Sequence, residues 1–292
     1  MRFDWYQATF AEKSPKGVLE ALQAAYGPGS GISPCTPLYG YGEGYAVVQG
    51  DLVRARVLAD GHGVHEIRKK YVHAWATSDD TDAFVDCVRN GWPDKHLVTR
   101  MDPENDFDEP GVFDRLLAVC LARGFADDVK LYRNGDWDRL VDGRTLYMGA
   151  PSSDVRARLY EKGKQLRSQI DTSGKLLSLD WTRLEIQIRP QGEARLAAAS
   201  MTPEEAWGCS QWTHSLLKDV TGLEVPRVRM RVWRKSDDQR AFEWMCKQYG
   251  RMLERLVPDL GDWLAVGLQI GSEIERQARL QRYGRACPPG LP

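Results

Sequence analysis

Two stretches of this chain alternate between apolar and polar residues, and that period constrains the fold more than any other feature. Residues 155–160 (VRARLY) and 181–189 (WTRLEIQIR) place apolar side chains at every second position. A period of two sends successive side chains to opposite faces of a β-strand. Each stretch therefore predicts a strand with one apolar face for a core and one polar face that carries the charged side chains.

The other segments mix strand and helix patterns without a regular β–α–β rhythm. This mixture predicts an α+β fold, with a curved, largely antiparallel β-sheet, flanking helices and a helical C-terminal tail. The further predicted strands are 3–10, 45–48, 51–60, 97–102, 129–133, 145–149 and 227–234, and the predicted helices are 16–26, 78–89, 109–123 and 202–218.

The tail predicts two helices, residues 239–256, ended by Pro258, and residues 261–283. We therefore expect an α+β domain over residues 1–236 and a helical C-terminal subdomain over residues 237–292.

Composition excludes several classes of protein. A hydrophobic content of 42% excludes a wholly disordered chain. No apolar run reaches the roughly 18 to 20 residues that span a bilayer, so we expect no membrane segment. Asp4 stands where an export signal would be apolar, and the six cysteines form no CxxC pair. These features predict a cytoplasmic protein with reduced thiols.

The polar face of the two alternating strands carries residues that could act on a phosphodiester. Arg158 and Tyr160 share one face, Lys162 follows, and Arg183 and Glu185 share a face of the later strand. A tyrosine oxygen can attack phosphorus as a covalent nucleophile, activated by a metal or by nearby cations that favour phenolate. Lysine and arginine can hold the non-bridging phosphate oxygens.

Acidic residues recur at alternate positions upstream. Asp102, Glu104 and Asp106 follow Arg100 at this spacing, although Pro103 disfavours one regular strand through the run. Carboxylate oxygens suit a hard cation such as Mg²⁺ or Mn²⁺, which would polarise the scissile phosphate.

The same pattern also fits a strand whose charged face is simply solvated. Tyr160 would then be an aromatic residue at the rim, and Arg183 and Glu185 a salt-bridged pair. The acidic run 102–109 would be a loop leading into a helix N-terminus, where acids are favoured.

Three short motifs in order resemble the replication initiation factor family. They are residues 145–149 (TLYMG), 158–163 (RLYEKG) and 181–185 (WTRLE), and an earlier R-x-D-x-x-x-D segment matches residues 100–106. Residues 3–5 and 244–253 also resemble the corresponding segments of this family. This family comprises rolling-circle initiators of filamentous phages and of one class of Gram-positive plasmids, together with relaxases of some conjugative elements.

The resemblance implies a site-specific DNA nickase and strand transferase. Tyr160 is the implied nucleophile, which nicks one strand and keeps a 5′-phosphotyrosyl link, while Arg158 and Lys162 contact the phosphate. Tyr147 lies in an equally recognisable motif and stays an alternative nucleophile.

The resemblance also implies a metal site. Asp102 and Glu185 are the implied ligands of Mg²⁺ or Mn²⁺, with Asp106 as a third ligand that Glu104 could replace. No two histidines flank a single apolar residue in this chain, so a metal would be bound by carboxylates.

Because the net charge is only −1, contacts to DNA would have to come from a local basic patch. The alternating arginines of residues 227–231 have an alternative interpretation. They could lie on an exposed edge strand, where their charge prevents aggregation. The predicted DNA contacts are Lys164, Arg183, Arg189, Arg227, Arg229 and Arg231.

The implied partner is origin DNA, double-stranded or single-stranded, in a bacterial host cell. The chain contains no GxxxxGK[ST] motif, so a host helicase would have to unwind the duplex. A homodimer, a relaxase role and a non-catalytic DNA-binding repressor on the same fold stay open.

Overall fold

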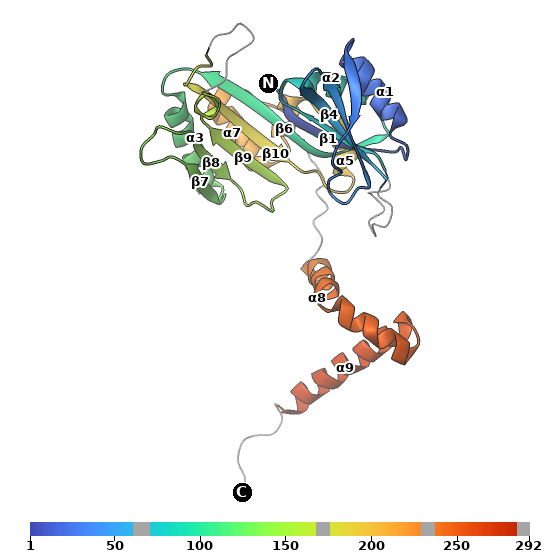
Figure 1. Ribbon diagram of the computed structural model, residues 1–292. Helices are drawn as coiled ribbons and strands as arrows, with labels where there is room; N and C mark the ends of the chain where they lie inside the picture. The colour runs from blue at the N-terminus through green and yellow to red at the C-terminus, as the bar shows by residue number, and fades with distance from the viewer. Residues whose placement is uncertain (61–70, 168–175, 229–236, 285–292) are drawn as a thin grey trace. The chain divides into compact units, whose positions relative to one another are not determined.

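The computed structural model of the chain describes residues 1–60, 71–167, 176–228 and 237–284. The chain divides into two compact units, Met1–Trp233 and Arg234–Pro292. The first unit contains the β-sheet and the second contains the last two helices (Figure 1). Among the helices of the described residues, none combines the length and apolar character needed to cross a bilayer.

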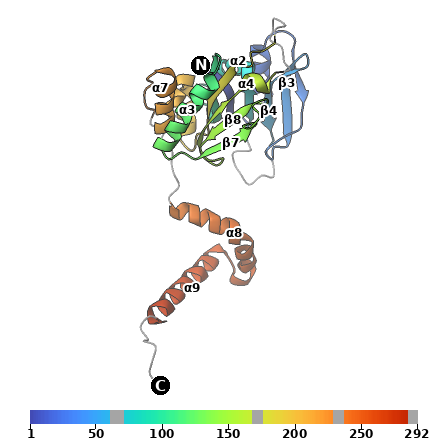
Figure 2. The same cartoon turned by 90° about the vertical axis from the view of Figure 1, so that its left-hand side faces the viewer.

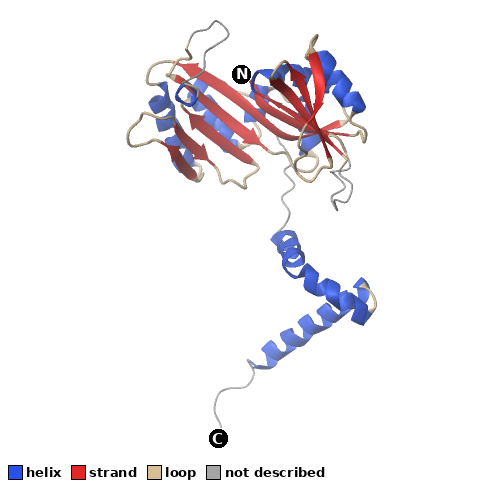
Figure 3. Cartoon of the chain, viewed as in Figure 1, coloured by secondary structure: helices blue, strands red, loops and turns tan. Residues whose placement is uncertain are grey.

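One ten-stranded sheet dominates the first unit (Figure 3). Its strand order is β2-β3-β4-β5-β1-β6-β10-β9-β8-β7, and every neighbouring pair is antiparallel. The predicted α+β fold with an antiparallel sheet is therefore confirmed. The strands are β1 (Arg2–Phe10), β2 (Ser30–Pro34), β3 (Glu43–Gln49), β4 (Leu52–Ala59), β5 (His73–Thr77), β6 (His96–Asp108), β7 (Leu131–Gly135), β8 (Arg144–Met148), β9 (Val155–Tyr160) and β10 (Trp181–Ile188).

Helices pack against the apolar side of the sheet. Helices α1 and α2 contact the strands β1 to β5, and α3 contacts β8 and β9. Helices α3 and α7 lie side by side (Figure 2). The helices of the first unit are α1 (Lys16–Ala25), α2 (Thr81–Gly91), α3 (Val112–Ala126), α4 (Lys162–Gln165), α5 (Ala194–Ala197), α6 (Pro203–Trp207) and α7 (Gln211–Thr221).

The alternation of β9 and β10 separates the core from the polar face as predicted. Leu159 and Leu184 are fully buried in the hydrophobic core, together with Leu116 of α3 and Leu216 of α7. The intervening residues of both strands face the other side of the sheet, where the candidate site lies.

Strand β6 corrects one prediction, because it continues past Pro103 to Asp108. Pro103 pairs with Phe3, and the register of β1 shifts between Phe3 and Trp5 at that point. A bulge relaxes the hydrogen-bonding demands of the ladder, so a proline without an N–H is tolerated there. The bulge also displaces Asp4 from the regular register.

The C-terminal unit contains α8 (Asp237–Leu260) and α9 (Trp263–Gly284), which contact each other. The prediction that Pro258 ends the first of them is wrong, because Pro258 lies inside the last turn of α8. A proline there disturbs only the final turn, and Gly261, with φ of 103°, follows the helix end.

Residues 229–234 of the predicted strand 227–234 lie outside the described residues, and Arg227 and Val228 adopt no regular structure.

Candidate active site

The strand register aligns the predicted site residues in two rows across the polar face of the sheet. Residues directly opposite one another in neighbouring antiparallel strands share a face, so each row is a set of neighbours. The rows are Thr145, Tyr160, Arg183 and Asp106, and Tyr147, Arg158, Glu185 and Glu104.

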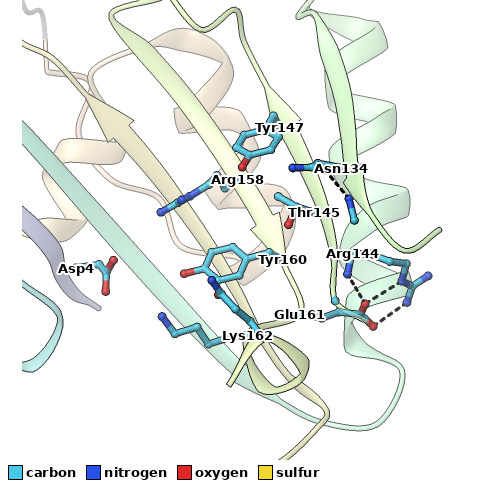
Figure 4. Close-up of a pocket in the computed structure, with 12 residues that line it drawn as sticks. Asp4, Asn134, Arg144, Thr145, Tyr147, Arg158, Tyr160, Glu161 and Lys162 are labelled. Atoms are coloured by element: carbon cyan, nitrogen blue, oxygen red, sulfur yellow. Dashed lines mark hydrogen bonds and ion pairs between the residues drawn. The ribbon is translucent and has the colours of Figure 1, made fainter. Parts of the chain in front are cut away.

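An open pocket of about 330 Å³ lies on this face (Figure 4). Tyr147, Arg158 and Tyr160 line it from β8 and β9, and Lys162 lines it from the start of α4. Asp4, which belongs to the bulge of β1, lines it from the other side. The pocket therefore holds both candidate nucleophiles and the cations that were predicted to contact phosphate.

Tyr160 is 7% exposed, and its hydroxyl donates a hydrogen bond to Oε2 of Glu185 over 3.2 Å. The Arg158 guanidinium lies 5.2 Å from the centre of the Tyr160 ring. Burial and the nearby Glu185 charge raise the pKa of Tyr160 well above its usual range, although Arg183 and Arg158 act in the opposite direction. The two arginines thus favour phenolate as expected, but burial and the Glu185 charge outweigh them, so the net shift of the Tyr160 pKa favours the phenol.

Glu185 joins Tyr160 to Arg158. Its Oε1 accepts a hydrogen bond of 2.7 Å from Nε of Arg158, while its Oε2 accepts the tyrosine hydroxyl. Glu185 is buried, and burial raises its pKa to about 7, partly offset by the Arg158 charge. A carboxylate with such a pKa can take up and release a proton near neutrality.

Arg183 is 1% exposed and lies among three carboxylates. Its guanidinium donates to Asp4 over 2.6 Å and to Asp106 over 2.7 Å, and it also contacts Glu104. The prediction that Arg183 contacts DNA therefore conflicts with the structure, because its charge is buried and already neutralised.

Asp102 is fully buried and accepts a hydrogen bond of 2.9 Å from Nε of Arg100. Its charge contributes to the raised pKa of Glu185, as expected for two acids on neighbouring strands of one face. Glu104 pairs with Arg2 over 2.6 Å, and burial raises the pKa of Glu104 to about 7. Both acids thus depend on arginines for their charge balance.

The predicted metal ligands supply suitable oxygen atoms but no site that is ready for an ion. Asp102, Asp106 and Glu185 each face an arginine. Within the part of the chain that the structure describes, no three His, Cys, Asp or Glu side chains are grouped so that they could hold a metal. The arginines occupy the positions at which a cation would balance these acids, so the side chains as arranged do not fit a metal.

A second buried ion pair fixes the chain directly after Tyr160, and the sequence reasoning missed it. Glu161 accepts from the backbone N–H of Arg144 over 2.8 Å and from its guanidinium over 3.0 Å. Lys164, a predicted DNA contact, pairs with Glu161 over 2.9 Å and donates to the Leu140 carbonyl. Glu161 lies inside the RLYEKG motif, and this position was the sequence feature that could have indicated its structural role.

The structure explains why the RLYEKG motif ends in a glycine, Gly163. A Cβ built on it would lie 1.8 Å from the carbonyl oxygen of Ser178 and 2.9 Å from Cα of Leu179. Only glycine permits this approach of α4 to the segment before β10, and this approach positions Lys162 beside the pocket.

The remaining predicted DNA contacts are Arg189, Arg227, Arg229 and Arg231. Arg189 is half-buried at the end of β10, where it donates to the Pro151 carbonyl. Arg227 is exposed. Arg229 and Arg231 lie outside the described residues.

Comparison with known proteins gives one family match. The model described as "Replication initiation factor" matches residues 123–257. This segment is similar to the replication initiation factor family. It contains Tyr147, Tyr160, Lys162 and Glu185, whereas Asp102 and the other acids of β6 lie outside it. The predicted family resemblance is thereby confirmed.

A solved structure titled as a rolling circle replication initiator protein from Geobacillus stearothermophilus is also similar to the chain. It shares 21% sequence identity at a TM-score of 0.49, and the match covers 77% of this chain and 97% of that one. No curated protein matches the chain.

Proposed function

We propose that this chain initiates rolling-circle replication by nicking and rejoining one DNA strand through Tyr160. The observation that carries the proposal is the hydrogen bond from the Tyr160 hydroxyl to Glu185, in a pocket that Arg158 and Lys162 line. The family match of residues 123–257 supports the same role.

The reaction is a transesterification at phosphorus. The Tyr160 oxygen bonds to phosphorus, its proton passes to Glu185, and the bond to the 3′ oxygen breaks. A 5′-phosphotyrosyl link and a free 3′ end result, and the reverse attack of a 3′ hydroxyl rejoins a strand. Arg158 and Lys162 hold the non-bridging oxygens, where negative charge develops.

The proposal also includes a divalent metal, Mg²⁺ or Mn²⁺, which would bind only after the acidic side chains have rearranged. Its proposed ligands are Asp102, Glu185 and Asp106, with Glu104 as the alternative to Asp106. Each of these carboxylates would have to release its arginine partner in order to bind the ion. When bound, such an ion would polarise the scissile phosphate.

Origin DNA is the proposed partner, and the biological setting is a phage, plasmid or integrated element in the bacterial cytoplasm. Arg227, Arg229, Arg231, Arg189 and Lys164 are the proposed contacts to its phosphates. A host helicase and a second copy of this chain are further proposed partners. We assign the chemistry to residues 1–236 and leave residues 237–292 as a helical accessory unit.

A catalytically inactive DNA-binding repressor is the competing interpretation. It would be favoured if the tyrosine and the acids lay on opposite faces of the sheet. Tyr160, Glu185 and Asp102 lie on one face, and the hydroxyl of Tyr160 contacts Glu185. This placement supports a nickase, and a relaxase would share its chemistry.

The deciding experiment replaces Tyr160 with Phe. The full chain is incubated with Mn²⁺ and with supercoiled plasmids that carry fragments of its own replicon. Denaturing electrophoresis then detects the covalent protein–DNA species. We expect Tyr160→Phe to abolish this species while DNA binding stays within about twofold. The matched control, Tyr147→Phe, should retain it; the opposite result would make Tyr147 the nucleophile.

A further inference from the structure

Lys162 holds a particular position in the pocket. It follows Tyr160 by two residues and begins α4, and its Nζ lies 5.6 Å from the centre of the Tyr160 ring and 6.0 Å from that of Trp181. Figure 4 shows Nζ of Lys162 and the hydroxyl of Tyr160 extending toward the same side of the pocket. A phosphate attacked by Tyr160 would therefore lie close to Nζ.

Lys162 also differs from the other cations that line this pocket. Arg158 is paired with Glu185, and Arg144 is paired with Glu161 and Asp114. Among the described residues, no carboxylate lies within ion-pair distance of Lys162. Its protons are consequently free to be donated to a substrate atom.

The nicking step requires a proton donor that the proposed nucleophile does not supply. The 3′ oxygen leaves as a strongly basic alkoxide, and the proton of Tyr160 passes to Glu185. A positioned acid typically accelerates such a departure 10²–10⁴-fold, as an order of magnitude. Arginine cannot serve, because its guanidinium does not deprotonate in proteins. Of the cations that line the described pocket, only a lysine can act as this acid.

We propose that Lys162 is a catalytic residue that protonates the leaving 3′ oxygen. This inference rests on the proposed nickase function. In nicking, the bond between phosphorus and the 3′ oxygen breaks, and that oxygen takes one proton from Nζ, which leaves a neutral amine. In rejoining, the neutral amine takes the proton back from the attacking 3′ hydroxyl, and Glu185 returns its proton to Tyr160.

The surroundings of Lys162 are compatible with this exchange. Burial lowers the pKa of its ammonium group, and the Arg183 charge acts in the same direction, while Asp4, Glu185 and Glu104 oppose the shift. A lowered pKa brings a lysine closer to the pH at which it can both release and recover a proton.

The test uses a leaving group that needs no proton. The nicked position is first mapped on cleaved plasmid. Two single-stranded oligonucleotides are then made across it, one normal and one with sulfur in place of the bridging 3′ oxygen. A thiolate is a much weaker base than an alkoxide, so it departs without protonation. The rate of covalent adduct formation is measured in a single turnover with Mn²⁺.

Two variants separate proton donation from phosphate contact. Lys162→Met removes both functions, whereas Lys162→Arg keeps the positive charge but cannot donate a proton. We expect both variants to lose at least about 100-fold on the normal substrate and to recover to within about tenfold of wild type on the sulfur substrate. Circular dichroism and DNA affinity check that both variants are folded and bind.

Other outcomes overturn the inference in distinct ways. If Lys162→Arg nicks the normal substrate at nearly the wild-type rate, Lys162 is only a phosphate contact. If the sulfur substrate rescues Tyr147→Phe instead, Tyr147 is the acid. If wild type forms no adduct on either substrate, or Tyr160→Phe still forms one, the proposed nickase mechanism itself fails.

Discussion

The hydroxyl of Tyr160 donates a hydrogen bond to Oε2 of Glu185 across the boundary between β9 and β10. The other oxygen of the same carboxylate accepts from Arg158. These three side chains adopt this arrangement because an antiparallel register places them on adjacent rows of one sheet face. In the proposed mechanism Tyr160 is the nucleophile and Glu185 is its proton acceptor, and their direct contact would reduce the reorganisation needed for attack.

Glu185→Gln tests this acceptor. The amide keeps nearly the same shape but cannot take the phenolic proton, so we expect adduct formation to fall at least about 100-fold. Measuring the rate with and without Mn²⁺ distinguishes two roles. If Glu185 is also a metal ligand, the residual activity will no longer respond to Mn²⁺. A nicking rate close to wild type would contradict both roles.

Arg183→Met tests the buried charge network. The change leaves Asp4, Glu104 and Asp106 without their shared counter-ion, and breaking a buried ion pair costs about 3–5 kcal/mol of unfolding free energy. Urea denaturation measures the loss. Arg183→Lys keeps the charge and should lose less. A loss below about 1 kcal/mol in Arg183→Met would show that water or protonation replaces the guanidinium.

His73 predicts a dependence of stability on pH. Burial lowers its pKa from 6.5 to about 4, and the Arg195 charge adds to the shift. As the pH falls, the unfolded chain protonates His73 at a higher pH than the folded chain does. The contribution of neutral His73 to the free energy of unfolding is therefore complete above pH 6.5 and is lost as the pH falls toward 4. We expect wild type to lose about 2 kcal/mol more between pH 7 and pH 5 than His73→Gln does. Equal losses in urea titrations of the two proteins would contradict a buried neutral His73.

Arg227→Ala tests the proposed phosphate contacts. Each neutralised phosphate contributes about 0.9 to the slope of log affinity against log salt on duplex DNA. We expect the variant to lower this slope by about that amount, as measured by fluorescence anisotropy at several NaCl concentrations. Arg115→Ala, which removes an exposed arginine that pairs with Glu109, is the matched control. An unchanged slope in Arg227→Ala would remove Arg227 from the DNA interface.

Local pattern predicted the strands of the site well, because a two-residue period is visible within one segment. The strands β8, β9 and β10 were expected close to their observed bounds, and so was the face shared by Arg158 and Tyr160. The continuation of β6 past Pro103 was not predictable, since the bulge that tolerates this proline belongs to β1, about a hundred residues away in the sequence.

The sequence alone determined which residues of each strand share a face, the antiparallel α+β class, and the presence of the initiator motifs. Only the tertiary structure decided which acid meets which arginine. Arg183 was predicted to bind DNA but is buried among Asp4, Glu104 and Asp106. These pairings depend on the register between strands that are distant in the chain, and burial then sets the pKa of each group. Neither can be read from the residues of one strand.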